Sequence, residues 1–139
     1  MIKNILSIML SPVTIHLTKK SRIKKGAFWQ ALEIFWRGDV TNWELFGQIR
    51  TKPNGKLLAD FQFEPITLGD RVENDVNLGE FSRIAPFLEI DQIADLPVTE
   101  SLLWYYDIFM RNPSNLTFDE IVAICEGRVE ITDNTTEIV

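Results

Sequence analysis

Few residues in this sequence have the types and spacing that catalysis requires. The chain has one cysteine, Cys125, and one histidine, His16, which together cannot supply the four ligands of a usual zinc site. Cys125 follows the apolar run 121–124, so we expect it to be a buried small hydrophobic residue. His16 lies in a predicted strand without a nucleophile or a group of carboxylates nearby, and we expect it to be an ordinary strand residue.

The sequence also lacks the local patterns that mark an enzyme. It contains no phosphate-binding loop, no dinucleotide-binding glycine pattern, no HExxH, no CxxC and no nucleophile elbow around a serine. We expect the neighbouring acids Asp119 and Glu120, and Glu73 and Asp75, to be solvated, because glycoside hydrolysis needs two carboxyl groups that face each other across a cleft. Loop acids such as Asp70 do not follow the EF-hand pattern for calcium. We therefore predict no catalytic residues, no cofactor and no metal site.

Charge is distributed unevenly along the 139 residues, whose net charge is −6. Residues 1–37 hold seven basic residues and one acid, a net charge of +6, whereas residues 38–139 hold seven basic and nineteen acidic residues, a net charge of −12. The basic segment either docks on the acidic body of a neighbouring copy or forms a solvated loop. Nucleic acid is disfavoured as a partner, because no aromatic residue is interleaved with the basic ones before Phe28. The basic candidates for an interface are Lys19, Lys20, Arg22, Lys24 and Lys25.

Aromatic residues are abundant for a chain of this size. The sequence contains four Trp, nine Phe and two Tyr, and several lie in segments that are apolar on both faces of a strand. Such residues either thicken the core or form a subunit interface, where aromatic side chains are enriched. The aromatic candidates for an interface are Trp29, Phe35, Trp36 and Trp104.

Strands must position these candidates, because alternating apolar residues and β-branched or aromatic types dominate the apolar segments. The turn at Asn54-Gly55 predicts a hairpin, since these two residues tolerate a positive φ. We expect residues 67–80 to form a loop or a distorted edge, and residues 91–96 a short helical turn. The segments predicted as strands are 13–18, 27–36, 41–51, 56–65, 87–90, 102–110 and 118–132.

Six to eight strands without a strong helix indicate an all-β fold, an antiparallel β-sandwich of the immunoglobulin-like or jelly-roll-like type. We predict an N-terminal arm over residues 1–25, apolar and then basic, and a single sandwich domain over residues 26–139. The apolar part of the arm is too short for a secretory signal, and no stretch approaches the ~20 apolar residues of a membrane span. We therefore expect no membrane span and synthesis in a cytoplasm.

Two stretches resemble a small β-sandwich that recurs in tail, baseplate and tail-tip proteins of tailed bacteriophages. The first, GDVTNWELFGQIRTKPNGKLLADFQFEP, covers residues 38–65, and the second covers residues 94–139, with WYYDI at 104–108 and GRVEIT at 127–132. These motifs describe turns and strand ends. The basic arm and residues 67–90 depart from the pattern.

The resemblance implies a non-enzymatic structural component of a phage virion, such as a baseplate, tail-tip or fibre-attachment protein. Such a protein would be made in the host cytoplasm, form a homo-oligomer, bind other tail or baseplate proteins and reside in the tail. A neck or capsid accessory protein is one alternative. Another is a carbohydrate-binding module for a host surface, in which Trp43 or Trp104 stacks on sugar rings. A small cell-wall hydrolase is a third.

Overall fold

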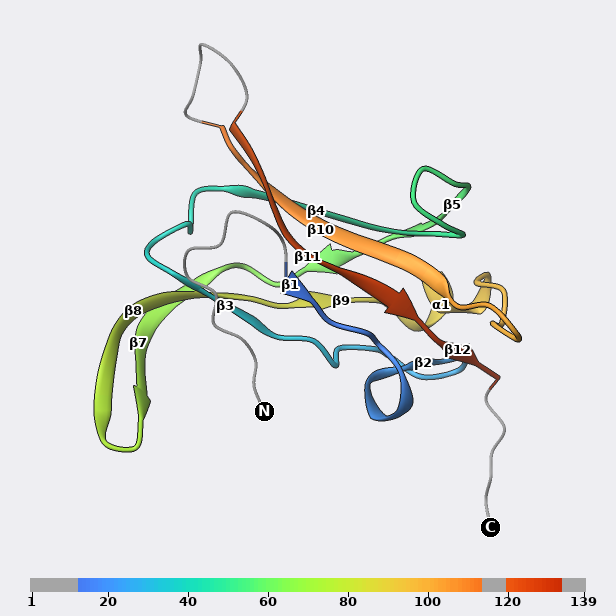
Figure 1. Ribbon diagram of the computed structural model, residues 1–139, viewed down its shortest axis with the longest axis horizontal. Coiled ribbons are helices and arrows are strands. Elements are labelled where there is room, and N and C mark those ends of the chain that lie inside the picture. Colours follow the sequence, from blue (N-terminus) through green and yellow to red (C-terminus); the bar gives the residue numbers. More distant parts are fainter. Residues whose placement is uncertain (1–12, 114–119, 134–139) are drawn as a thin grey trace.

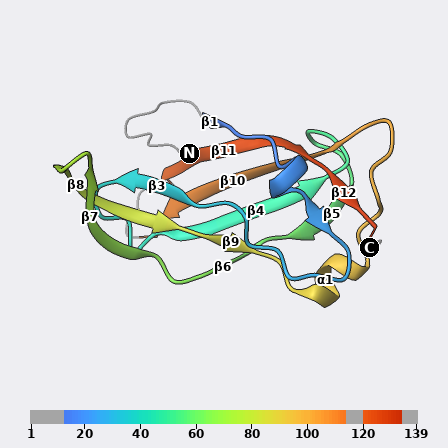
Figure 2. The same ribbon diagram turned by 90° about the horizontal axis from the view of Figure 1, so that it is seen from below.

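The computed structural model describes residues 13–113 and 120–133. Over these residues the protein is all-β, as predicted, with two layers of strands stacked into a sandwich (Figure 1, Figure 2). The predicted apolar start of the arm, Asp119, and the residues from 134 onward lie outside the described part of the chain.

One layer is a five-stranded sheet in the order β1-β11-β10-β4-β5. All neighbours in it are antiparallel except β1, which runs parallel to β11. The predicted hairpin between β4 and β5 is confirmed: the Gly55 N–H donates to the Lys52 carbonyl (2.8 Å), and Asn54 has a φ of 63°. The strands are β1 (Val13–Thr14), β4 (Glu44–Arg50), β5 (Leu57–Asp60), β10 (Trp104–Asn112) and β11 (Glu120–Val129).

The opposite layer contains the antiparallel sheet β3-β8-β7 and a ribbon of β6 and β9, while a parallel ribbon of β2 and β12 lies beside the sandwich. Its elements include a 3-10 turn, Lys19–Ser21, and the helix α1 (Ile90–Ala94), which confirms the predicted helical turn. The strands are β2 (Ile23–Lys24), β3 (Ile34–Arg37), β6 (Gln62–Phe63), β7 (Thr67–Glu73), β8 (Val76–Ile84), β9 (Pro86–Phe87) and β12 (Ile131–Thr132).

The core lies between the two layers and is built largely on β10. Tyr106, Ile108 and Met110 are buried, because alternate side chains of a strand point to the same face. Trp29 and Phe61 pack against them from the other side, with ring centroids 5.6 Å apart, and the Phe61 ring meets the Tyr106 ring edge-on at 5.9 Å. The strand predicted over 102–110 is therefore confirmed as β10, but only one of its two apolar faces lies in the core.

The described part of the predicted arm is bonded to the domain. Leu17 is fully buried and bridges Val129, and the Ile23 N–H donates to the Glu130 carbonyl (3.0 Å). Gly127 lets the backbone of Ile15 lie close to β11, since a Cβ at position 127 would stand 2.1 Å from the Ile15 carbonyl oxygen. Residues 13–24 thus run along β11 and β12 and are held there by backbone hydrogen bonds.

Two predicted elements require correction. The sequence predicts one strand over 27–36, but the strand is β3 alone, because Trp29 turns into the core and its indole N–H donates to the Ser21 carbonyl (2.9 Å). Residues 67–80, predicted as a loop or a distorted edge, are not a loop: they belong to the β7–β8 hairpin. β7 is the edge strand of its sheet and its register with β8 shifts between Arg71 and Val72, as the second alternative predicted. The turn residues of the hairpin, Asn74 and Asp75, have φ values of 53° and 66°, the positive pair that a type I′ turn requires.

Two other predicted strands are shorter in the structure. The strand predicted over 13–18 is regular only at β1, and the one predicted over 87–90 is β9, which ends at Phe87. Among the described residues, no helix is long and apolar enough to cross a membrane.

Candidate functional site

The most prominent surface feature is the β7–β8 hairpin, which curves away from the five-stranded sheet (Figure 1). No residue between positions 67 and 80 is buried. Val72 and Val76, near the tip, are 62% and 55% exposed, and Leu68 is also exposed. Three apolar side chains therefore stand in solvent on a projecting element, which makes the hairpin a candidate interaction site.

Two arginine–aromatic contacts anchor the base of the hairpin. The guanidinium carbon of Arg71 lies 3.9 Å from the centroid of the Phe35 ring, and that of Arg37 lies 4.7 Å from the centroid of the Phe81 ring. Arg37 also donates to the Leu78 carbonyl (2.8 Å). These contacts occupy one face of the β3-β8-β7 sheet and fix the direction of the hairpin.

The other face of the hairpin, its inner face, is acidic and apolar. Leu68 pairs with Ser82, whose side chain is buried, so Leu68, Asp70 and Val72 continue the core-facing side of the sheet beyond the body. Asp70 lies directly opposite Glu80, and in residues 13–113 and 120–133 no ion pair involves either of them. Like charges directly opposite one another are destabilising, so this pair favours a basic partner.

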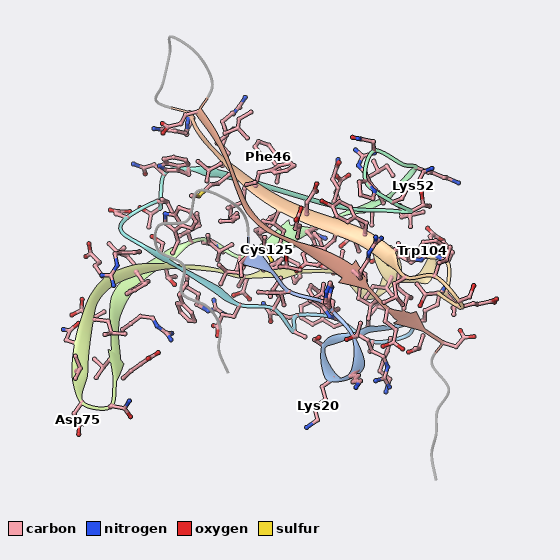
Figure 3. All side chains as sticks on the ribbon, viewed as in Figure 1. Lys20, Phe46, Lys52, Asp75, Trp104 and Cys125 are labelled. Carbon is pink, nitrogen blue, oxygen red and sulfur yellow. The ribbon has the colours of Figure 1, made fainter. Side chains whose placement is uncertain are left out.

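The predicted basic candidates form a second projection, separate from the hairpin. Figure 3 places Lys20 on this projection and Asp75 at the hairpin tip, both on the same side of the molecule. Lys19, Lys20 and Lys24 are exposed, and no ion pair holds them within the described ranges. We call Lys19, Lys20 and Lys24 the lysine patch.

The remaining two basic candidates are engaged inside the chain. Arg22 donates to the Lys19 carbonyl (2.7 Å) and to the Thr132 hydroxyl (3.3 Å), and so closes the 3-10 turn against β12. Lys25 donates to the Leu96 carbonyl (2.6 Å). They position the lysine patch and are poorly placed to contact a partner.

The predicted aromatic candidates are mostly used by the fold. Trp29 is only 3% exposed, which removes it from the interface set. Phe35 lies under an arginine, and Trp36 is half-buried and packs against the core. Trp104 donates its indole N–H to the Pro97 carbonyl (2.8 Å) and lines a surface hollow. The second layer, which sequence reasoning could not place, consumes most of the apolar surface that seemed surplus.

The sequence did not predict the hairpin as a candidate interaction site. Asn74-Asp75 was the signal that could have found it, since both residue types tolerate the positive φ of a tight turn. The signal is faint because the hairpin is exposed on both faces, and its strands lack the alternation of apolar and polar residues that a half-buried strand shows.

Two other titratable groups of the described residues, His16 and Cys125, are held by the fold. His16 Nδ1 accepts a hydrogen bond from the Arg128 N–H (3.0 Å), which ties the segment after β1 to β11. Burial raises the pKa of the Cys125 thiol to about 11, so the thiol stays protonated near neutral pH and is a poor nucleophile. Within the part of the chain that the structure describes, no group of three or more His, Cys, Asp or Glu residues could hold a metal ion.

Comparison with known proteins assigns no family. The sequence matches no protein-family model and no curated protein. The features that bear on function are therefore the hairpin and the lysine patch, beside the resemblance carried by residues 38–65 and 94–139.

Proposed function

We propose that this chain is a structural subunit that assembles with copies of itself through the β7–β8 hairpin. The observation that carries the proposal is that no residue of 67–80 is buried in the single subunit, while Leu68, Val72 and Val76 stand in solvent. Ordering a hairpin costs conformational entropy, and burial of apolar surface is the usual compensation. A partner that covers the hairpin supplies that burial.

The lysine patch of a neighbouring copy is the partner that charge favours. The hairpin carries Asp70 and Glu80 on its inner face. Asp70 accepts a hydrogen bond from the Asn77 amide (3.3 Å), and neither acid is in an ion pair with another described residue. The lysine patch is exposed on a different projection. Opposite charges on two surfaces steer their encounter and set their register. Because the two surfaces are different, the contact is heterologous, which leads to rings or open chains of subunits.

A tailed-phage virion is the setting that we propose for this assembly. Its support is the resemblance to tail, baseplate and tail-tip domains, proteins that repeat around a common axis, and a head-to-tail contact suits such a repeat. Mass spectrometry of purified particles from the source of the gene tests the setting. We expect the chain in stoichiometric amounts with tail proteins, and particles without it would contradict the assignment.

Charge reversal tests the contact itself. We expect the wild type to assemble in a concentration-dependent manner in sedimentation velocity, and both Asp70→Lys/Glu80→Lys and Lys20→Glu/Lys24→Glu to remain monomeric. An equimolar mixture of the two variants should assemble again, because each reversed surface then meets its complement on the other variant.

A matched control separates this contact from a general effect of charge. Asp91→Lys/Glu100→Lys changes the net charge by the same amount as the hairpin variant, at exposed residues on α1 and the loop after it. This control should assemble as the wild type does. A wild type that stays monomeric at every concentration, or a mixture that fails to assemble, overturns the proposal.

A further inference from the structure

A hollow of 590 Å³ lies on the outer face of the five-stranded sheet, the face turned away from the second layer. The turn of the β4–β5 hairpin, residues 53–54, forms one wall of it. Figure 3 shows this turn, marked by Lys52, and the side chain of Phe46 standing on that outer side. The sheet itself supplies the rest of the lining: Gln48, Arg50, Tyr105, Asp107 and Phe109.

Strand geometry sets the order of these side chains. Tyr105, Asp107 and Phe109 are alternate residues of β10 and share its outer face, and Tyr105 lies opposite Arg50 while Asp107 lies opposite Gln48. At about 3.3 Å per residue, the two aromatic positions are about 13 Å apart. The groove therefore has an aromatic ring towards each end and a carboxyl group between them.

Hydrogen bonds inside the chain hold the polar lining in place. Arg50 donates to the Gly55 carbonyl (2.9 Å) and to the Gln48 side chain, whose own amide donates to Asp60 (3.0 Å). The guanidinium and amide planes are thus fixed before any ligand arrives, which lowers the entropy that binding must overcome.

Asp107 differs from its neighbours because it receives no hydrogen bond from the described part of the chain. Its carboxyl is half-buried; burial raises its pKa, the Arg50 guanidinium lowers it and the Glu126 carboxylate raises it. A partly buried acceptor without a donor gains most from a ligand that brings one. Tyr105 presents its ring beside it, while its hydroxyl donates to Glu126 (2.9 Å).

We propose that this groove binds a short neutral oligosaccharide, with Tyr105 and Phe109 as stacking surfaces for sugar rings and Asp107 as the acceptor for sugar hydroxyl groups. Such a ligand matches the lining, since it offers apolar ring faces together with many hydroxyl donors. The lining contains one cationic side chain, Arg50, and one anionic side chain, Asp107. A charged ligand would be repelled by whichever of the two has the same sign of charge, whereas a neutral ligand is repelled by neither.

An extended peptide fits this face less well. At the groove, residues 48–50 of β4 lie between β10 and β5, and β10 lies between β4 and β11. The groove therefore presents no free strand edge to which a peptide strand could add. The proposed groove also differs from the sugar-binding residues that the sequence suggested, Trp43 and Trp104. Trp43 packs against the core, and Trp104 lines a separate hollow, so neither belongs to the groove.

A glycan array bearing neutral and acidic glycans, followed by titration with the neutral glycan that binds most strongly, tests the site. We expect binding to neutral glycans, and amide chemical-shift changes confined to β4, β10 and the turn 51–56. Tyr105→Ala and Phe109→Ala should each weaken binding about tenfold, the loss of about one stacking contact. Asp107→Asn keeps the shape and should weaken binding several-fold.

Leu102→Ala is the matched control, because it removes an exposed apolar side chain outside the groove; it should bind as the wild type does, and circular dichroism should show all variants folded. Absence of binding to any neutral glycan, binding to acidic glycans alone, or shift changes elsewhere overturns the inference. The hairpin variant Asp70→Lys/Glu80→Lys should bind sugar normally, so failure of the assembly proposal and failure of this one are distinguishable.

Discussion

Gly127 shows how one residue can decide whether an entire segment joins the fold. A Cβ there would stand 2.1 Å from the Ile15 carbonyl oxygen and 3.1 Å from the Tyr106 ring, so the backbone after β1 approaches β11 only because the side chain is missing. We expect Gly127→Ala to lower the free energy of unfolding by about 2–3 kcal/mol, the usual scale of an overpacked core. Urea unfolding followed by tryptophan fluorescence measures this change.

Gly69 provides the control, since nothing lies within 4 Å of the position its Cβ would take. Gly69→Ala should change stability by no more than about 0.5 kcal/mol. Equal effects of the two substitutions would mean that the close approach at Gly127 is not what limits packing.

Cys125 makes stability depend on pH in the alkaline range. Burial raises the pKa of its thiol from 9.0 to about 11, opposed by the Tyr106 hydroxyl bond and reinforced by Glu126. Because the folded pKa lies above the unfolded one, the contribution to stability is complete below pH 9 and is lost as the pH rises from 9 towards 11. The loss from pH 8 to pH 10 should be about 1 kcal/mol.

Urea unfolding at pH 8, 9 and 10, with Cys125→Ala for comparison, isolates this contribution. The variant should lose about 1 kcal/mol less than the wild type over that range. Burial also raises the pKa of Tyr105 from 10.0 to about 12. The contribution of Tyr105 to stability is therefore lost mainly as the pH rises above 10, outside the range of these measurements. Parallel pH profiles for the two proteins would contradict the assigned role of the thiol.

At the scale of elements, the β7–β8 hairpin and β10 differ in how firmly they are held. β10 lies between two partner strands and carries three buried core residues, Tyr106, Ile108 and Met110. β7 has one partner strand and no buried residue. Elements with little burial open without global unfolding, so in dilute subunits the amides of Thr67–Glu73 should exchange at least about tenfold faster than those of β10.

Hydrogen exchange with mass spectrometry or NMR measures this ratio. Assembly should slow exchange in β7 and leave β10 unchanged, because the proposed contact covers the hairpin alone. Exchange in β7 as slow as in β10 in the isolated subunit would show that the hairpin does not depend on a partner for its stability.

The difference between local patterns and contacts distant in sequence explains how much of the fold the sequence predicts. The turn at Asn54-Gly55 and the apolar, aromatic run 102–110 are local patterns, and both predict the observed elements. Trp29 could not be placed in this way, because its burial depends on a bridge to Leu88, far along the chain. The groove was equally hidden, since it is assembled by the register of β4 against β10, which brings Gln48 beside Asp107.

At the scale of the whole molecule, the two candidate contact surfaces lie on one side and the groove on another. The hairpin and the lysine patch project from the same side (Figure 3), whereas the groove is on the outer face of the five-stranded sheet. Assembly through the first pair therefore leaves the groove open. A repeating array of such subunits would present many identical sugar sites, and linking several weak sites raises overall affinity without any new contact.

Because the hairpin and the lysine patch are different surfaces, wild-type assembly should pass beyond a dimer. Each subunit would use its hairpin on one neighbour and its lysine patch on the next, the condition for a ring or an open chain. Asp70→Lys/Glu80→Lys keeps the lysine patch but loses the acidic inner face, so it should end a growing chain or break a ring. We expect mass photometry to show wild-type species larger than a dimer, whose mean mass falls as this variant is added, and Asp91→Lys/Glu100→Lys to leave that mass unchanged. A wild type that stops at a dimer, with a mass insensitive to the variant, would instead indicate a symmetric contact between two hairpins.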